Sequence, residues 1–232
     1  MDFEPNIIYE DNHLLVIIKP QNVAVQEDES KDDDLLNLLK NFIKQRDNKP
    51  GNVYLGLVHR LDRPTGGIMV FAKTSKAASR LTEQLKNHEM KKSYVCVVVG
   101  EPERPNGRLK AYLQKDEKTN TVRLATASDY GAKEAILDYE VVSSRQNYSL
   151  VAVELLTGRS HQIRVQMSKQ NKTVIFGDFK YGDKTHKSNL ALWAYKLRFK
   201  HPTTKKQMEF VCAPNTEVSP WKSFSKELEK LI

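Results

Sequence analysis

The sequence predicts an α+β fold built on a mixed β-sheet. Strand-like segments follow one another in runs with a few helix-like segments inserted, whereas strict alternation of strand and helix would indicate a parallel sheet. The 232 residues fall in the size range of one domain or one domain with a small satellite. Because no repeat, low-complexity tract or Gly/Ser-rich linker marks a boundary, we expect residues 1–232 to form a single domain.

The N-terminal segment is expected to form a hairpin followed by a helix. Residues 6–9 and 14–19 are strand-like, a turn-forming Glu-Asp-Asn-His segment separates them, and Pro20 ends the second strand. Residues 35–46 place leucine, phenylalanine and isoleucine on one face of a helix. Asp34 stands where an N-cap is needed.

The middle of the chain is expected to hold a polar loop between two strands. Residues 53–58 and 68–72 are apolar, and residues 59–67 between them are polar. Ser75 is expected to cap a helix over residues 75–88 that has a small apolar face. Further strands are expected over residues 94–99, 132–142 and 148–156, with a polar hairpin-like segment over 104–120.

The C-terminal third begins with a turn at residues 157–159 and a short helix over 160–169, with Ser160 as the N-cap. The remaining strands are expected at 174–176, 191–199 and 209–212, and a closing helix at 220–231.

Composition excludes several classes of protein. Hydrophobic residues make up 39% and charged residues 28%, which excludes fibrous and wholly disordered chains. The apolar runs, such as 14–18 and 95–99, fall far short of the roughly 20 residues that cross a bilayer. Residues 1–6 have neither a basic stretch nor an apolar one, so we expect no secretory signal, no membrane partner and a cytoplasmic location.

Several catalytic and metal-binding motifs are missing from the sequence. It has no Gly-rich phosphate loop, dinucleotide fingerprint, HExxH, paired CxxC or GxSxG element. The six histidines lack metal-ligand spacing, and Cys96 and Cys212 are expected to be buried free thiols. A cofactor-free enzyme or a binding module without a metal therefore remains.

The net charge points to a polyanionic partner. Lysine and arginine number 37 against 29 acidic residues, a formal charge of +8. Such a balance is compatible with nucleic acid as a partner, although a solvated lysine face gives the same count.

Three segments could carry chemistry. In loop 59–67, Asp62 lies between Arg60 and Arg63, and cations that hold a carboxylate ionised suit a nucleophile or electrostatic stabiliser. The two glycines that follow allow another molecule to approach closely. The alternative is a surface Arg–Asp pair on a turn.

The second segment is residues 155–164, where a strand ends in Thr-Gly and a helix begins. Free N–H groups at such a start favour anions, and Arg159 adds charge. Arg164 lies among apolar positions, which predicts a partly buried arginine with a carboxylate partner. An exposed arginine that buries only its stem is the alternative.

The third segment places Lys91 and Lys92 before Tyr94 at the start of a strand. An aromatic face beside cations is how proteins hold a splayed-out base, although a tyrosine on a strand is more commonly a core residue.

Together these segments resemble the RluA-type pseudouridine synthases. Residues 59–67 (HRLDRPTGG) with 71–74 (FAKT) are similar to the family's HRLDxxTSG…AK signature. Further elements occur in the family's order at residues 9–16 and 19–20, at 92–94 (KSY), at 157–164 (TGRSHQIR), at 177–182 (GDFKYG) and at 190–192 (LAL). The resemblance covers about residues 6–212.

The resemblance implies an RNA-modifying isomerase. Uridine in ribosomal or transfer RNA would become pseudouridine by breakage of the C1′–N1 bond and formation of a C1′–C5 bond, with neither cofactor nor metal. The base must first leave the RNA stack and enter a pocket. The implied fold is a mixed, mainly antiparallel central sheet flanked by helices, with the active-site cleft across the sheet. A monomer without an obligatory protein partner and without an N-terminal S4 domain is expected.

The resemblance also implies roles for single residues. Asp62 would be the catalytic residue, Tyr94 would pack against the flipped uracil, and Arg164 would pair with Asp62. Leu192 would line the base pocket. Contacts to RNA would come from Arg60, Arg63, Lys92, Arg159 and His161.

Three departures from the family pattern are visible: Gly66, Trp193, and the pair Gln166 and Met167. They touch none of Asp62, Tyr94 and Arg164. Two other interpretations stay open. One is an inactive RNA-binding module of the same fold. The other is an unrelated phosphodiesterase with His13, His59 or His161 as acid–base groups.

Overall fold

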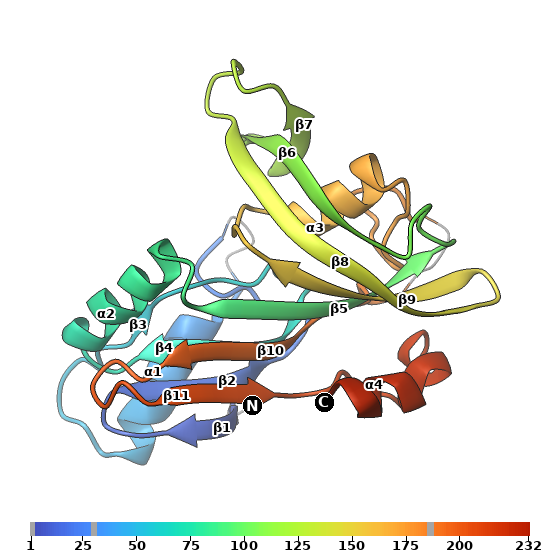
Figure 1. Cartoon of the computed structure of the whole chain (residues 1–232). Coiled ribbons are helices and arrows are strands. Elements are labelled where there is room, and N and C mark those ends of the chain that lie inside the picture. Colours follow the sequence, from blue (N-terminus) through green and yellow to red (C-terminus); the bar gives the residue numbers. More distant parts are fainter. Residues whose placement is uncertain (1–2, 29–31, 185–187) are drawn as a thin grey trace. The chain divides into compact units, whose positions relative to one another are not determined.

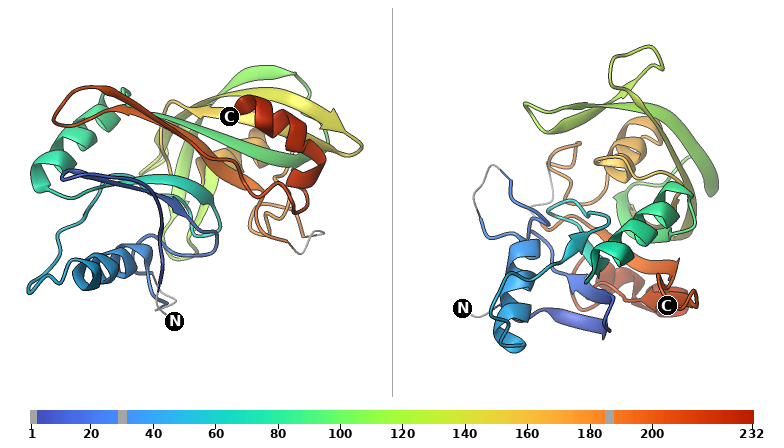
Figure 2. Two further views of the ribbon diagram at one scale, coloured as in Figure 1. Left: turned by 90° about the horizontal axis from the view of Figure 1, so that it is seen from below. Right: turned by 90° about the vertical axis from the view of Figure 1, so that its left-hand side faces the viewer.

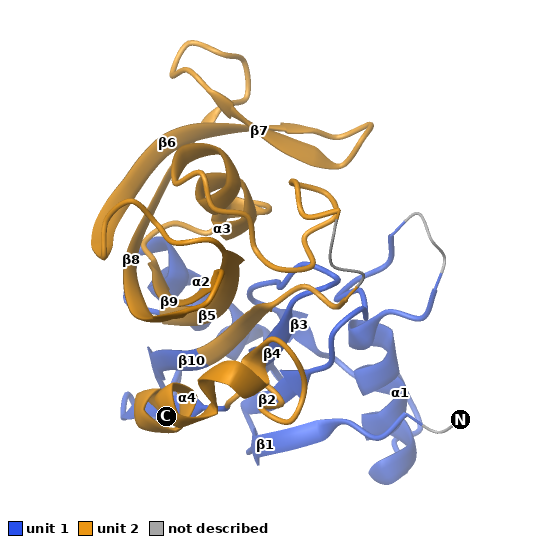
Figure 3. Cartoon of the chain, turned by 90° about the vertical axis from the view of Figure 1, so that its right-hand side faces the viewer, with its two compact units in different colours: residues 1–90, 196–212 blue, residues 91–195, 213–232 orange. Residues whose placement is uncertain are grey.

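The strands and helices of the chain gather into two compact units (Figure 3). The computed structural model describes residues 3–28, 32–184 and 188–232, so the first two residues of the segment examined for a signal lie outside it. Unit 1 comprises residues 1–90 and 196–212, and unit 2 comprises residues 91–195 and 213–232. The single domain expected for residues 1–232 stays a prediction.

Unit 1 is an antiparallel sheet with two helices (Figure 1). Strands β1 and β2 form the expected hairpin, whose turn is closed by Asp11 Oδ1, which accepts hydrogen bonds from the backbone N–H groups of His13 and Leu14, each at 2.7 Å. The elements of this unit are β1 Asn6–Glu10, β2 Leu14–Lys19, α1 Leu35–Arg46, β3 Gly56–Leu57, β4 Gly66–Ala72, α2 Ser75–Lys86 and β11 Gln207–Val211.

Local sequence explains where these helices begin. The Asp34 side chain accepts a hydrogen bond from the Asn37 N–H and caps α1, as expected. The cap of α2 is Thr74, whose Oγ1 accepts from the Ala77 N–H at 3.1 Å, so the expectation of Ser75 was wrong by one residue. The core of unit 1 combines buried side chains of β2, β4, α2 and the end of β10, Leu192–Lys200.

Unit 2 is a strongly bent antiparallel sheet with the strand order β5-β9-β8-β6-β7. A short α-helix and a π-helical turn pack on β6, β7 and β8 through a cluster that includes Leu113, Val122, Ala135 and Val165 (Figure 2). The elements are β5 Lys91–Val99, β6 Asn106–Asp116, β7 Thr121–Ala125, β8 Lys133–Arg145, β9 Tyr148–Leu155, α3 Gln162–Val165, a π-helical turn Gln166–Gln170, a 3₁₀ turn Trp221–Phe224 and α4 Ser225–Leu231.

The α+β class is confirmed, and every strand pairing whose register is described is antiparallel. Two expected strands differ, and one strand was not expected. Strand 53–58 shortens to the two residues of β3, residues 174–176 form only an isolated bridge between Ile175 and Val98, and β7 lies in a segment for which no strand was expected. In the described residues, no helix has the length and apolar character needed to cross a membrane.

Candidate active site

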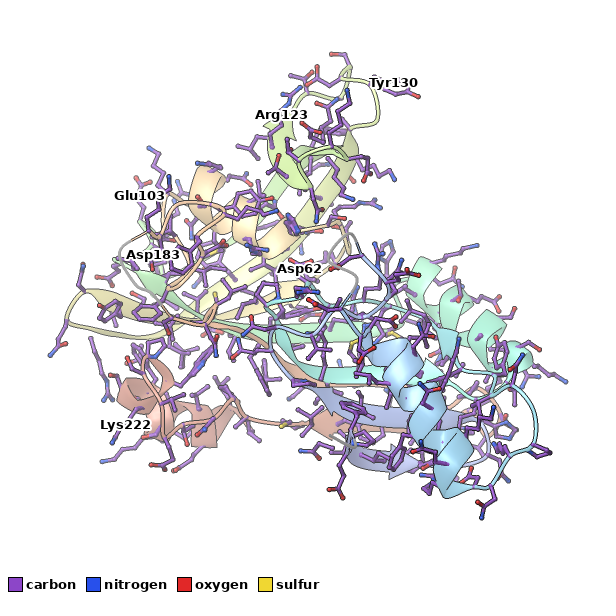
Figure 4. All side chains as sticks on the ribbon, turned by 180° about the vertical axis from the view of Figure 1, so that it is seen from behind. Asp62, Glu103, Arg123, Tyr130, Asp183 and Lys222 are labelled. Atoms are coloured by element: carbon purple, nitrogen blue, oxygen red, sulfur yellow. The ribbon has the colours of Figure 1, made fainter. Side chains whose placement is uncertain are left out.

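The loop that carries Asp62 connects β3 to β4 and is fixed at both ends. At its start, the buried His59 accepts a hydrogen bond at Nε2 from the Val70 N–H, at 3.1 Å. At its end, the Thr65 N–H donates to the Asp62 carbonyl at 2.9 Å and closes a turn. The Asp62 side chain is half-buried on this turn, and Figure 4 labels it. The backbone around Asp62 is thus held by hydrogen bonds inside unit 1.

The buried side chain of Lys19 stabilises the same turn through hydrogen bonds to backbone carbonyls. Its side chain is 0% exposed, and Nζ donates to the carbonyls of Pro20 at 2.8 Å, Arg63 at 3.0 Å and Thr65 at 2.8 Å. Burial lowers the pKa of Lys19 to about 7, against the opposing attraction of Asp62. Sequence reasoning assigned no role to Lys19; the signal was a lysine at the end of an otherwise apolar strand.

The two arginines that flank Asp62 have partners of their own. Arg60 is exposed and donates to Gln26 Oε1 at 3.1 Å. Arg63 lies 2.8 Å from Asp32 and 3.3 Å from Asp28, and its hydrogen bond to Asp32 raises its pKa. Arg60 therefore presents the less neutralised charge of the two.

Tyr94 and Leu192, which the resemblance assigns to the base pocket, are both buried side chains of unit 2. Tyr94 on β5 is 6% exposed, and Leu192 at the start of β10 is 3% exposed. Lys92 lies two residues before Tyr94 on β5, so both side chains point to the same face of that strand. The placement is compatible with both readings of Tyr94, as core residue and as stacking surface.

Arg164 is buried, as predicted, and its carboxylate partner in unit 2 is Asp178. The guanidinium donates from Nε and Nη2 to the two carboxylate oxygens at 2.8 and 2.7 Å, and its carbon lies 5.1 Å from the centre of the Tyr181 ring. Asp178 belongs to the family element at residues 177–182, for which no role was predicted. The expected pairing of Arg164 with Asp62 joins the two units and stays a prediction.

The expected N-cap of the helix after residue 159 was wrong. Helix α3 begins at Gln162 and not at Ser160, because His161 adopts a left-handed conformation with φ of 51°. The Gln162 side chain accepts hydrogen bonds from the Arg159 N–H and the Thr157 hydroxyl, and donates to the Ile136 carbonyl. The Arg159 N–H is thereby occupied, so the anion site expected at the helix start must depend on side chains.

The histidines considered as acid–base groups serve structural contacts. His59 binds a backbone N–H, and His161 Nδ1 shares a 2.6 Å hydrogen bond with the Tyr181 hydroxyl, which also accepts from the Val122 N–H. The His13 ring packs edge-on against His201. Within the described part of the chain, no group of three or more His, Cys, Asp or Glu side chains could hold a metal ion.

Comparisons with known proteins agree with one another. A model of the RNA pseudouridylate synthase family matches residues 13–169. Among similar proteins is ribosomal large subunit pseudouridine synthase D of Zymomonas mobilis, 34% identical over 221 residues that cover 90% of this chain and 69% of the relative. Ribosomal large subunit pseudouridine synthase C of Haemophilus ducreyi is 31% identical, over 92% of this chain and 66% of the relative.

A similar solved structure is human RNA pseudouridylate synthase domain containing 4. It superposes with a TM-score of 0.77 at 23% identity and covers 97% of this chain and 93% of its own. This likeness establishes the shared fold. The chain spans about two thirds of the length of the two bacterial relatives.

Proposed function

This chain belongs to the RNA pseudouridylate synthase family, and from that membership we propose that Asp62 is the catalytic residue with which it isomerises uridine in ribosomal RNA. The reaction breaks the C1′–N1 bond, turns the uracil, and forms a C1′–C5 bond, while C5 loses a proton to solvent and N1 gains one. Asp62 supplies the carboxylate that acts beside C1′. The substrate class follows the names of the bacterial relatives, which are ribosomal large subunit synthases.

The observation that carries this proposal is the support given to Asp62. A catalytic carboxylate must be held in a productive position by its surroundings. The turn at residues 62–65 is bonded to the ammonium of Lys19 through two carbonyls, and the start of the loop is bonded through His59 to β4. A surface Arg–Asp pair on a mobile turn would need neither buried anchor.

Residues of unit 2 are proposed to hold the extruded base. Tyr94 offers an aromatic ring, and Leu192 offers an apolar wall. Arg164 brings a positive charge whose orientation is fixed by Asp178 and Tyr181, and we assign it to the Asp62 carboxylate. An enzyme that acts on a base taken out of the stack needs these three features.

Contacts to the RNA backbone are assigned to Arg60, Arg63, Lys92, Arg159 and His161. The arginines and lysine supply positive charge, and Arg63 contributes less because Asp28 and Asp32 already oppose its charge. We propose further that the enzyme acts as a monomer in the cytoplasm, without a cofactor or an obligatory protein partner.

The replacement of Asp62 by asparagine tests the catalytic role. Asp62→Asn keeps the shape of the side chain and removes its charge, so release of tritium from C5-labelled uridine in ribosomal RNA should fall by at least ~10³-fold. Affinity for the RNA should change little. Asp138→Asn, the same replacement on the exposed surface of β8, is the control and should retain full activity.

Three outcomes would contradict the proposal in different ways. Retention of more than roughly a few per cent of the rate by Asp62→Asn would remove Asp62 from the chemistry. A wild-type protein that binds RNA but releases no tritium from ribosomal or transfer RNA would be the inactive module. Activity on transfer RNA alone would leave the role of Asp62 intact and refute the substrate class.

A further inference from the structure

Lys92 on β5 and Arg159 in the turn after β9 are two cations of unit 2, near enough for the charge of Arg159 to act on Lys92. Lys92 on β5 pairs in register with Leu155 on β9, and residues 157–159 follow that strand (Figure 1). The Lys92 ammonium lies 2.8 Å from the position that a Cβ atom would occupy on Gly158. The missing side chain of Gly158 therefore makes room for the ammonium, next to Arg159.

Neither cation has a carboxylate partner among residues 3–28, 32–184 and 188–232. Arg159 donates only from Nε, to the Glu134 carbonyl at 2.8 Å, which leaves both Nη groups available. The nearby carboxylates are engaged elsewhere: Glu134 binds Lys110 at 2.8 Å, and Glu154 lies 3.8 Å from Lys91. Lys92 and Arg159 therefore form a local excess of positive charge, whereas most other surface cations of this sheet form ion pairs with carboxylates.

The closeness of the two positive charges is electrostatically unfavourable unless an anion is bound. Lys92 is half-buried, and both burial and the neighbouring charge of Arg159 lower its pKa. An anion bound between the two side chains would offset the repulsion between their positive charges. It would also replace the hydration that the ammonium loses on burial. Phosphate oxygens match the donors offered, a compact ammonium and a planar guanidinium.

We propose that Lys92 Nζ and the Arg159 Nη groups together bind a single phosphate of the RNA backbone, beside the nucleotide whose base is held at Tyr94. This inference rests on the proposed function, because it takes the RNA of that reaction as the ligand. Tyr94 follows Lys92 by two residues on the same face of β5, about 7 Å away along the strand. The site would fix the position of the RNA strand along the protein, so that one nucleotide is presented to the pocket.

Salt dependence of RNA binding distinguishes one shared phosphate from two separate ones. The affinity of a labelled ribosomal RNA stem-loop would be measured between ~50 and ~200 mM salt for Lys92→Met, Arg159→Met and the double variant. Loss of one phosphate contact reduces the slope of log K against log salt by about 0.7 on a single strand. We expect the double variant to lose about 0.7 in total, and not about 1.4.

Two further variants separate the local site from net charge. Gly158→Ala keeps every charge but places a methyl group where the ammonium lies, so it should weaken binding although the protein remains folded. Lys110→Met removes one charge from an exposed, ion-paired lysine of the same unit and should leave the slope nearly unchanged. Thermal melting of each variant verifies folding; Lys92→Met should melt no lower than wild type, because it removes a half-buried charge.

Binding is measured in the Asp62→Asn background, so that turnover does not enter. An unchanged slope for the double variant, or an equal change for Lys110→Met, would overturn the phosphate site even if Asp62 proves catalytic. A loss of about 1.4 in the double variant would mean two separate phosphates and would also overturn it. If Asp62→Asn instead remains active, the proposed catalytic role fails while the binding result stands.

Discussion

The buried ion pair between Arg164 and Asp178 can be used to measure how much burial adds to the stability that a bidentate ion pair provides. Asp178→Asn keeps the shape of the side chain and one carbonyl acceptor but removes the carboxylate charge that the guanidinium binds at two points. The side chains of the pair are 6% and 1% exposed, so water cannot replace the lost partner. We therefore expect a large loss of stability.

The magnitude follows from the cost of breaking a buried ion pair. Removal of one partner of a buried pair costs about 3–5 kcal/mol. A folded domain is stable by only about 5–15 kcal/mol, so Asp178→Asn should remove a large share of the free energy of unfolding. The ring of Tyr181, 5.1 Å from the guanidinium carbon, remains as a weak substitute partner and does not replace a carboxylate.

Unit 2 also contains a matched control pair on the exposed surface of its sheet. Arg108 and Asp138 form the same bidentate contact at 2.7 and 2.8 Å, but their side chains are 60% and 42% exposed. Asp138→Asn should cost less than about 1 kcal/mol. Urea denaturation of both variants measures the two losses. If they are equal, burial does not decide the value of these pairs and the reasoning is refuted.

Three further predictions concern titration, thiol reactivity and salt. The pKa of Lys19 is about 7 in the folded chain, against an ordinary value of 10.5, so the unfolded chain binds more protons between these two pH values. The free energy of unfolding, measured by urea denaturation, should therefore rise with pH in this range. Lys19→Met should abolish that rise. Burial raises the pKa of Cys96 to about 12, so a thiol reagent at pH 8 should modify the half-buried Cys212 slowly and Cys96 only after unfolding; rapid labelling of Cys96 would contradict this. RNA affinity should fall at least ~10-fold between ~50 and ~200 mM salt, and Arg60→Ala should flatten this dependence more than Arg63→Ala.

Much of the fold could be predicted from local pattern. The first hairpin, helix α1 with its Asp34 cap and the long strands of unit 2 depend on periodicity and turn residues, which short windows of sequence contain. Strand β3 proved shorter than its apolar run, because pairing with β4 extends over only two residues. The apolar character of a segment predicts that it is buried better than it predicts which strand it pairs with.

The predicted site was incomplete where a residue acts through distant backbone or side chains. The burial of Arg164 followed from its apolar neighbours, but its partner Asp178 is separated from it by 14 positions. Lys19 binds carbonyls 44 and 46 positions away. The local preference for Ser160 as a cap was overridden by Gln162, whose amide reaches the Ile136 carbonyl on β8. Such contacts have no signature within a sequence window.

The division of unit 1 between two distant stretches of chain has a consequence for synthesis on the ribosome. Its core requires Leu197 and Phe199, which are made only after the sheet of unit 2. At about 5–20 residues per second, the stretch from residue 91 to residue 212 takes roughly 6–24 s to translate. During that interval β2 and β4 lack the strand that completes their core. The apolar edge of a nascent unit 1 is therefore exposed to chaperones and to neighbouring chains, whereas unit 2 can assemble most of its sheet as it emerges.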